Sequence, residues 1–320
     1  MNASTTAVAP LFDRGGTRGT RVGIEHELVA RDESGAAASI GWIRAVAGRS
    51  AYAPFLGFEP GGQVELSLPA AADAAVAGRE LCEAVSSLRT DCARIGVRLS
   101  AIPTDPRPVE EIPLQLTSAR YVAMQRHFDT IGPAGRRMMR ATASTQICLD
   151  WWPGAAGLEQ WRVLLLAGPF LAAAYARSAG PGSRLATWLA VDPARTAFDD
   201  RLLHGDPVRA YADFAAGARV FVDGAPAAHL TTLFPPVRPR GRYLEVRFLD
   251  VQQEEDVAAI VGAFASLLYD DGHRARVLTR LAADGPALAE HWRAAAAGDV
   301  DTAELGRELL RDVPALVGVA

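Results

Sequence analysis

Acidic and amide residues recur at alternate positions of four short, otherwise apolar segments, residues 22–28, 63–68, 144–149 and 244–248. Successive side chains of a β-strand point to opposite faces, so Glu25 and Glu27 are expected to share one face of the first segment. Glu65, Gln146 and Glu245 take the same place in the other three. Carboxylates held close together repel unless a proton or cation lies between them, and their oxygens suit Mg²⁺ or Mn²⁺. The alternation supports a metal cluster and a solvated sheet face about equally.

Two neighbouring features bear on this choice. Gly61 and Gly62 interrupt the strand pattern directly after Glu59, which indicates a bulge, a close approach of the backbone to a ligand, or an ordinary tight turn. Arg247 stands two residues after Glu245 and therefore on the same strand face. A guanidinium there suits a carboxylate or phosphate ligand, with simple neutralisation of Glu245 as the alternative.

The elements that must position these residues alternate along the chain, which predicts an α+β class. Strands are expected at residues 21–30, 55–68, 97–102, 143–150, 219–222 and 243–249. Helices are expected at 39–47, 70–95, 118–130, 158–178 and 207–216, with a Pro- and Arg-rich loop at 231–241. We expect one catalytic domain over residues 1–320, with a flexible lead-in at 1–20 and a helical C-terminal part at 254–320.

Composition excludes several classes of protein. The chain has 320 residues, of which 49% are hydrophobic, so a large core is available and global disorder is excluded. All 33 basic residues are arginine, which excludes lysine-dependent chemistry, and the net charge of −4 argues against a nucleic-acid partner. Three cysteines without a CxxC spacing do not form a disulfide framework or zinc site. No segment resembles a signal peptide or a membrane span, so we expect a cytoplasmic protein without a membrane partner.

Four motifs in this order resemble one known family. They are Gly23-Ile24-Glu25-His26-Glu27, Phe58-Glu59-Pro60-Gly61-Gly62-Gln63-Val64-Glu65, Met138-Met139-Arg140-Ala141-Thr142-Ala143-Ser144-Thr145-Gln146, and Thr232-Leu233-Phe234-Pro235-Pro236-Val237-Arg238 followed by Leu244-Glu245-Val246-Arg247. They resemble the plant-type and actinobacterial branch of the glutamate–cysteine ligases, and most of all the enzymes that make γ-glutamylcysteine for ergothioneine synthesis. The resemblance implies a glutamine-synthetase-like fold, in which a curved antiparallel β-sheet forms a bowl with helices packed outside.

The resemblance also implies a reaction and a set of site residues. ATP would phosphorylate the γ-carboxylate of glutamate, and the amine of cysteine would attack the acyl phosphate. For Mg²⁺ or Mn²⁺ it implies that one ion is shared by Glu27 and Glu245, a second is held by Glu25, Glu59 and Glu65, and a third is bound in part by Gln146. Arg247 would stabilise the transferring phosphoryl group and Arg238 would bind ATP. Arg184, Trp188 and Arg195 would belong to the amino-acid site, although Arg184 and Arg195 fit surface arginines equally well.

Three alternatives remain open at this point. The segment between Val222 and His229 is shorter than the branch pattern, which leaves the identity of the amine open. A γ-glutamyl ligase that uses a different amine would keep the same acids. A metal-dependent hydrolase would use the carboxylates to activate water. A paralogue without activity would bind small molecules only.

Overall fold

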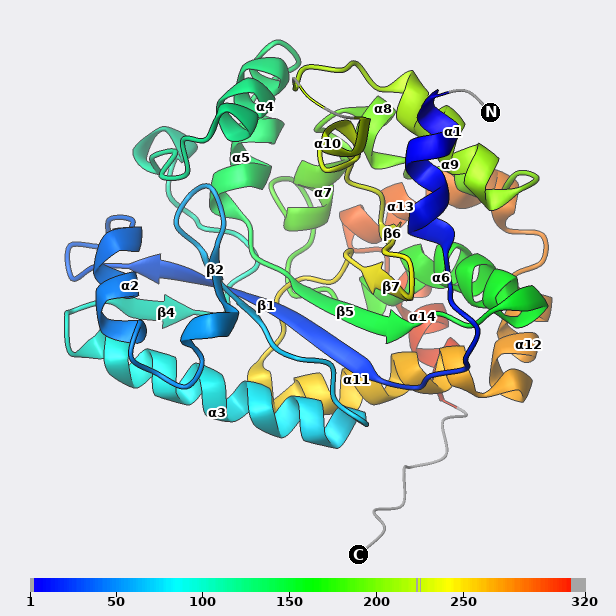
Figure 1. Ribbon diagram of the computed structural model, residues 1–320, viewed down its shortest axis with the longest axis horizontal. Coiled ribbons are helices and arrows are strands. Elements are labelled where there is room, and N and C mark those ends of the chain that lie inside the picture. Colours follow the sequence, from blue (N-terminus) through cyan, green and yellow to red (C-terminus); the bar gives the residue numbers. More distant parts are fainter. Residues whose placement is uncertain (1–2, 223, 225, 312–320) are drawn as a thin grey trace, which may run out of the picture.

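The computed structural model describes residues 3–222, 224 and 226–311 (Figure 1). Seven strands form its antiparallel sheet: β1 Val22–Arg31, β2 Leu56–Phe58, β3 Val64–Ser67, β4 Arg98–Ser100, β5 Thr145–Asp150, β6 Val237–Pro239 and β7 Tyr243–Val246. The spatial order is β2-β3-β1-β5-β7-β6, with β4 pairing to the end of β1. Strands far apart in sequence thus meet around β1, and the predicted α+β class with an antiparallel sheet is confirmed.

Helices cover the sheet on both sides (Figure 1). They are α1 Ala3–Val8, α2 Ile40–Ala47, α3 Ala74–Ala93, α4 Ala119–Asp129, α5 Ala134–Ala141, α6 Gly154–Ala174, α7 Arg184–Leu189, α8 Pro193–Thr196, α9 Pro207–Gly217, α10 Pro226–Leu230, α11 Glu254–Tyr269, α12 Asp271–Arg280, α13 Leu288–Ala297 and α14 Val300–Leu309. Short 3₁₀ helices lie at Ala9–Phe12, Ala53–Phe55, Val109–Glu111, Asp200–Leu203 and Gly285–Ala287. Among the described residues, no helix has the length and apolarity needed to span a membrane.

One face of the sheet is apolar and carries the core. Ile24, Leu28, Leu66 and Ile147 are each at most 2% exposed. Helix α3 packs against β1 and β4, and α11 runs alongside α3 (Figure 1). Helix α3 begins at the N-cap Asp73, whose side chain accepts a hydrogen bond from the Val76 amide. The apolar positions of the strands therefore select this side for burial, and the opposite side is left for polar chemistry.

The flexible lead-in predicted at residues 1–20 is wrong for residues 3–12. This segment forms α1 and the 3₁₀ helix Ala9–Phe12. Val8 is fully buried, and the ring of Phe12 packs edge-on against Trp151 and Tyr211 at centroid distances of 5.4 and 5.7 Å. Apolar contacts with residues far along the chain fix a segment whose local composition favours a loop.

Two further expectations about strands are wrong for the same kind of reason. Residues 219–222 pair with no strand of the described chain, and Val220 is 62% exposed. A strand, β6, lies instead inside the predicted loop and pairs with β7. Pro239 is tolerated there because β6 is the edge of the sheet, where a missing N–H breaks no ladder.

The C-terminal part is helical as far as the structure describes it. Helices α11 to α14 are separated near Asp271, Asp284 and Gly298, where glycine or proline residues interrupt the helical pattern of the sequence. Gly298 takes a left-handed conformation with φ of 80°, which suits a residue that ends α13. Residues 312–320 of the expected helical part lie outside the described residues.

Candidate active site

Strand register brings the predicted acids onto one face, which we call the acidic face and define by Glu25, Glu27, Glu65, Gln146 and Glu245. Glu27 lies opposite Glu65 across β1 and β3, and Glu25 lies opposite Gln146 across β1 and β5. Glu245 of β7 lies opposite Cys148 of β5. The alternation seen in the sequence thus converges on one surface from four strands.

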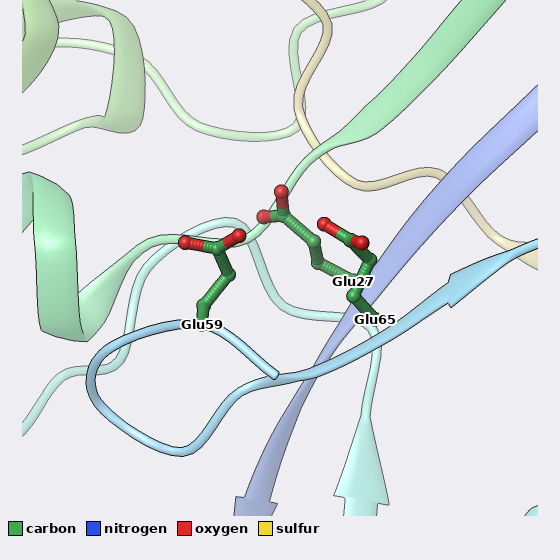
Figure 2. A group of neighbouring side chains, drawn as sticks. All are labelled: Glu27, Glu59 and Glu65. Atoms are coloured by element: carbon green, nitrogen blue, oxygen red, sulfur yellow. The ribbon is translucent and has the colours of Figure 1, made fainter. Parts of the chain in front are cut away.

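The tightest group on this face is Glu27, Glu59 and Glu65 (Figure 2). Each offers a carboxylate oxygen, and these three oxygens lie within 4.8 Å of one another. Glu27 and Glu65 project from strands, whereas Glu59 projects from the loop between β2 and β3 (Figure 2). Three hard oxygen donors at this spacing fit a divalent cation of the Mg²⁺ or Mn²⁺ type.

The glycines after Glu59 explain how the loop reaches the cluster. Gly62 has φ of +94°, which an L side chain rarely adopts. A Cβ on Gly61 would lie 2.2 Å from the Arg140 carbonyl oxygen, so only glycine fits against that backbone. The side chain of Gln63 accepts from the Gly61 amide at 3.0 Å and donates to the Thr142 carbonyl at 2.8 Å. A tight turn at Gly62 and a close backbone contact with the C-terminal end of α5 therefore position the loop that carries Glu59.

Electrostatics make this group a strong cation site. Burial, reinforced by Glu245 and Glu65, raises the pKa of Glu25 to about 7. Burial also raises the pKa of Glu27, and it raises the pKa of Glu59 well above its usual value together with the charges of Glu27 and Glu65. Carboxylates with raised pKa values gain from a cation that balances their charge, so these residues fit a divalent ion.

Gln146 and Ser144 hold Glu27 in place. The Ser144 amide and hydroxyl donate to Glu27 at 2.7 and 2.9 Å, and the Gln146 Nε2 donates at 3.1 Å. Gln146 Oε1 is buried and has no hydrogen-bond partner among the described residues. An amide oxygen left without a donor is a candidate ligand for a cation or a substrate amine.

Glu245 stands apart from the carboxylate group because arginines surround it. Arg247 lies 2.7 Å, Arg240 3.3 Å and Arg238 3.4 Å from its carboxylate oxygens. Burial opposes ionisation of Glu245, but these three guanidiniums outweigh burial and lower its pKa. The pairing of Glu27 with Glu245 on one ion is thus not the grouping that the structure favours, since Glu27 clusters with Glu59 and Glu65.

Two cavities meet at the acidic face. The smaller, of about 80 Å³, is lined by Glu27, Ser144, Arg184 and Trp188, among others. The larger, of about 560 Å³, includes Glu25, Glu65 and Glu245 together with Arg120, Arg238 and Arg240. Residues that line both are Glu59, Met138, Gln146, Phe234 and Arg247. The carboxylates therefore separate a small chamber from a large chamber rich in cations.

Arg184 and Trp188 reach the small chamber. Arg184 donates to the carbonyls of Arg247 and Phe248 at 2.9 and 3.3 Å, and its guanidinium lies 5.0 Å from the Trp188 ring centroid. Its geometry thus fixes the backbone that carries Arg247. Trp188 Nε1 is buried and has no hydrogen-bond partner among the described residues, so it is a candidate donor to a ligand.

Arg195 is placed elsewhere. It is fully buried, donates to the Thr232 hydroxyl at 2.7 Å and to the Arg219 carbonyl, and pairs with Asp192 at 3.2 Å. It lines neither of the two cavities. The alternative of a surface arginine is wrong for Arg195, because its side chain is buried and anchors loops inside the protein.

Several residues of the site escaped the sequence interpretation. Arg120, Tyr121 and Arg240 line the large chamber, and Ser144 holds Glu27. Arg240 carried a signal, since it follows Arg238 in the Pro- and Arg-rich segment, and so did Ser144, which shares a motif and a strand face with Gln146. The others depend on contacts between elements distant in sequence.

Comparisons with known proteins identify the family of the chain. The profile of glutamate-cysteine ligase family 2 (GCS2) matches residues 21–316. The chain is 33% identical over 299 residues to glutamate–cysteine ligase EgtA of Mycolicibacterium smegmatis, which covers 78% of this chain and 69% of that protein. It is 31% identical over 258 residues to the EgtA of Mycobacterium tuberculosis, with 66% and 59% covered. The chain thus spans only about 60 to 70% of these relatives.

The fold of the chain also resembles that of a solved structure. The bifunctional glutathione synthetase of Pasteurella multocida superposes with a TM-score of 0.53 at 14% identity, covering 96% of this chain and 49% of that one. At this identity the likeness concerns the fold alone, and it agrees with the predicted glutamine-synthetase-like bowl. The chain belongs to glutamate–cysteine ligase family 2, as its motifs predicted.

Proposed function

We propose that this protein is an ATP-dependent ligase that joins the γ-carboxylate of glutamate to an amine, with cysteine as the amine and γ-glutamylcysteine as product. The supporting observation is the carboxylate group Glu27, Glu59 and Glu65 between a small chamber and a large arginine-lined chamber. Family membership supports the same reaction. In the proposed arrangement the nucleotide occupies the large chamber and the amino acid the small one.

The residues present fit a divalent ion, and we propose that Glu27, Glu59 and Glu65 hold Mg²⁺ or Mn²⁺, with Glu25 and Gln146 contributing nearby. Such an ion supplies charge neutralisation for phosphoryl transfer. The family resemblance implies three ions. We assign only the ion that Glu27, Glu59 and Glu65 would hold.

The chain's own residues position the phosphates. Arg238 and Arg247 each have a buried Nε without a hydrogen-bond partner among the described residues. Both side chains line the large chamber, and a permanent cation with a free donor suits a phosphate oxygen. We propose that Arg247, which borders both chambers, stabilises the phosphoryl group during transfer.

The proposed reaction proceeds in two displacement steps. A γ-carboxylate oxygen of glutamate forms a bond to the terminal phosphorus of ATP while the bond to the ADP oxygen breaks. The amine nitrogen then bonds to the acyl carbon, the carbon–oxygen bond to phosphate breaks, and the amine loses its proton. Trp188 Nε1 and Arg184, on the small chamber, are proposed to orient glutamate. A reaction that consumes ATP suits the cytoplasm, which we propose as its location.

The test is ADP release by the purified protein with Mg²⁺-ATP, glutamate and a panel of amines that begins with cysteine. ADP formation that requires both glutamate and cysteine supports the proposal. Strict preference for another amine identifies a ligase of a specialised pathway and overturns the cysteine assignment. Hydrolysis of a γ-glutamyl amide without ATP would identify a hydrolase, and ligand binding without turnover an inactive paralogue.

A further inference from the structure

The N-terminal segment Ala3–Phe12 precedes the part of the chain that matches the family profile, residues 21–316. It nevertheless borders the large chamber, because Ala7, Pro10 and Leu11 line that cavity. The wall of the proposed nucleotide chamber is therefore built in part by residues outside the family region.

This segment is firmly attached. Val8 is fully buried, and Phe12 packs edge-on against Tyr211 of α9, itself a lining residue of the chamber. The Gly241 amide, in the turn between β6 and β7, donates to the Leu11 carbonyl at 2.8 Å. The segment is thus tied to the same hairpin that carries Arg238 and Arg240. Figure 1 shows α1 running beside α9 and α10 above this hairpin.

The large chamber divides by polarity. Arg238, Arg240 and Arg247 gather around Glu245 at the sheet. One apolar part of the lining comes from Ala7, Pro10 and Leu11 together with Tyr211, Ala227 and Leu230, and Met124, Met138, Met139 and Phe234 add further apolar lining. A nucleoside triphosphate divides in the same way, into a charged phosphate chain and a flat, weakly polar base.

We propose that Ala7, Pro10 and Leu11 form the wall against which the base of ATP packs, so that these residues set affinity for the nucleoside part and not for the phosphates. This inference rests on the proposed function, since it takes ATP as the occupant of the large chamber. It assigns a specificity role to residues that the family match does not include.

The test compares two phenylalanine substitutions, one at a residue that lines the chamber and one at a nearby residue that does not. Ala7→Phe projects into the chamber, whereas Ala9→Phe lies on the same short segment at an exposed position that does not line the cavity. Calorimetry measures binding of two probes, Mg²⁺-ATP and Mg²⁺-tripolyphosphate. We expect Ala7→Phe to raise the Kd for ATP by about 10-fold or more and to leave the tripolyphosphate Kd within about twofold. Ala9→Phe leaves both unchanged.

Each other result is decisive. An unchanged ATP Kd in Ala7→Phe, or an equal loss for both probes, overturns the inference while the proposed function stands. Failure of the wild-type protein to bind Mg²⁺-ATP refutes the proposed function itself. If circular dichroism shows that Ala7→Phe does not fold, Leu11→Ala replaces it. That variant is expected to raise the Kd for ATP about threefold to fivefold and to leave the Kd for tripolyphosphate unchanged. An unchanged ATP Kd refutes the inference.

Discussion

The two faces of strand β1 hold buried acids of the same type in opposite electrostatic states. On the back face, Glu254 of α11 receives two hydrogen bonds from Arg89 at 2.7 and 3.0 Å and lies 3.4 Å from His26. Burial opposes its ionisation, but the hydrogen bonds from His26 and Arg89 outweigh burial and lower its pKa to about 2. On the acidic face, burial and like charges raise the pKa values of Glu25, Glu27 and Glu59.

The difference separates an acid that stabilises the fold from acids that we propose to serve a ligand. Glu254 has a permanent cation, Arg89, within the chain, so its charge is balanced in the folded protein without a ligand. Glu25, Glu27 and Glu59 instead concentrate charge that a proton or a bound cation must balance. Sites that hold strongly perturbed groups in a cavity are candidates for function, and here the contrast lies across a single strand.

The largest effect is expected at Glu59. Glu59→Gln removes one of three clustered carboxylates, and turnover should fall by about 10²–10³-fold in the coupled assay of ADP release. The same change relieves repulsion, so the variant should melt at a higher temperature than wild type in EDTA. Glu110→Gln, an exposed acid, is the control and should change neither quantity. Wild-type turnover in Glu59→Gln would show that the cluster does not bind the catalytic ion.

Arg247→Gln comes next. Its guanidinium borders both chambers and contacts Glu245 at 2.7 Å. We expect kcat to fall about 100-fold, because a transition-state charge loses its partner, while Arg238 and Arg240 still balance Glu245. Steady-state kinetics with Arg242→Gln, an exposed arginine of the same hairpin, provide the control. A rise in KM with unchanged kcat would contradict a role in phosphoryl transfer.

On the back face, removing the cation that pairs with Glu254 should lower the stability of the fold but leave kcat unchanged. Arg89→Met leaves Glu254 buried without its main cation, and the free energy of unfolding should drop by roughly 2 kcal/mol, less than for a fully buried pair because Arg89 is partly exposed. Arg94→Met is the control, because it removes a surface ion pair with Asp91 at the end of the same helix. It should change the free energy of unfolding by less than about 0.5 kcal/mol. Urea titration measures both. A large fall in kcat per folded Arg89→Met molecule would break the distinction between the faces.

The smallest effect is a pH dependence of opposite sign on the two faces. Glu25 has a folded pKa of about 7 against 4.5 ordinarily, so without metal the folded state binds the extra proton and stability declines as pH rises from about 4.5 to about 7. Glu254, with a lowered pKa, contributes stability above pH 4.5 that is lost as pH falls toward 2. Melting curves in EDTA should show the first decline, and saturating Mg²⁺ or Glu25→Gln should flatten it. A decline that persists in Glu25→Gln would assign it to another group.

Much of this arrangement was predictable from alternation. The period of two placed Glu25 and Glu27 on one face and His26 on the other. His26 is fully buried, and its Nδ1 lies 3.0 Å from the Thr145 hydroxyl. The Pro and Gly positions located the helix breaks of the C-terminal part. By contrast, Arg184 and Arg195 looked equivalent in the sequence, yet only Arg184 reaches a chamber.

The sequence by itself determined which residues share a face, where helices stop, and which family the motifs belong to. These features depend on local backbone geometry, which repeats every two or 3.6 residues regardless of the rest of the chain. Only the tertiary structure decided that Glu27 meets Glu59 and Glu65 while Glu245 meets three arginines, and that the N-terminal helix borders the large chamber. Strand order and register join segments that are tens to hundreds of residues apart, and no local period encodes which of them become neighbours.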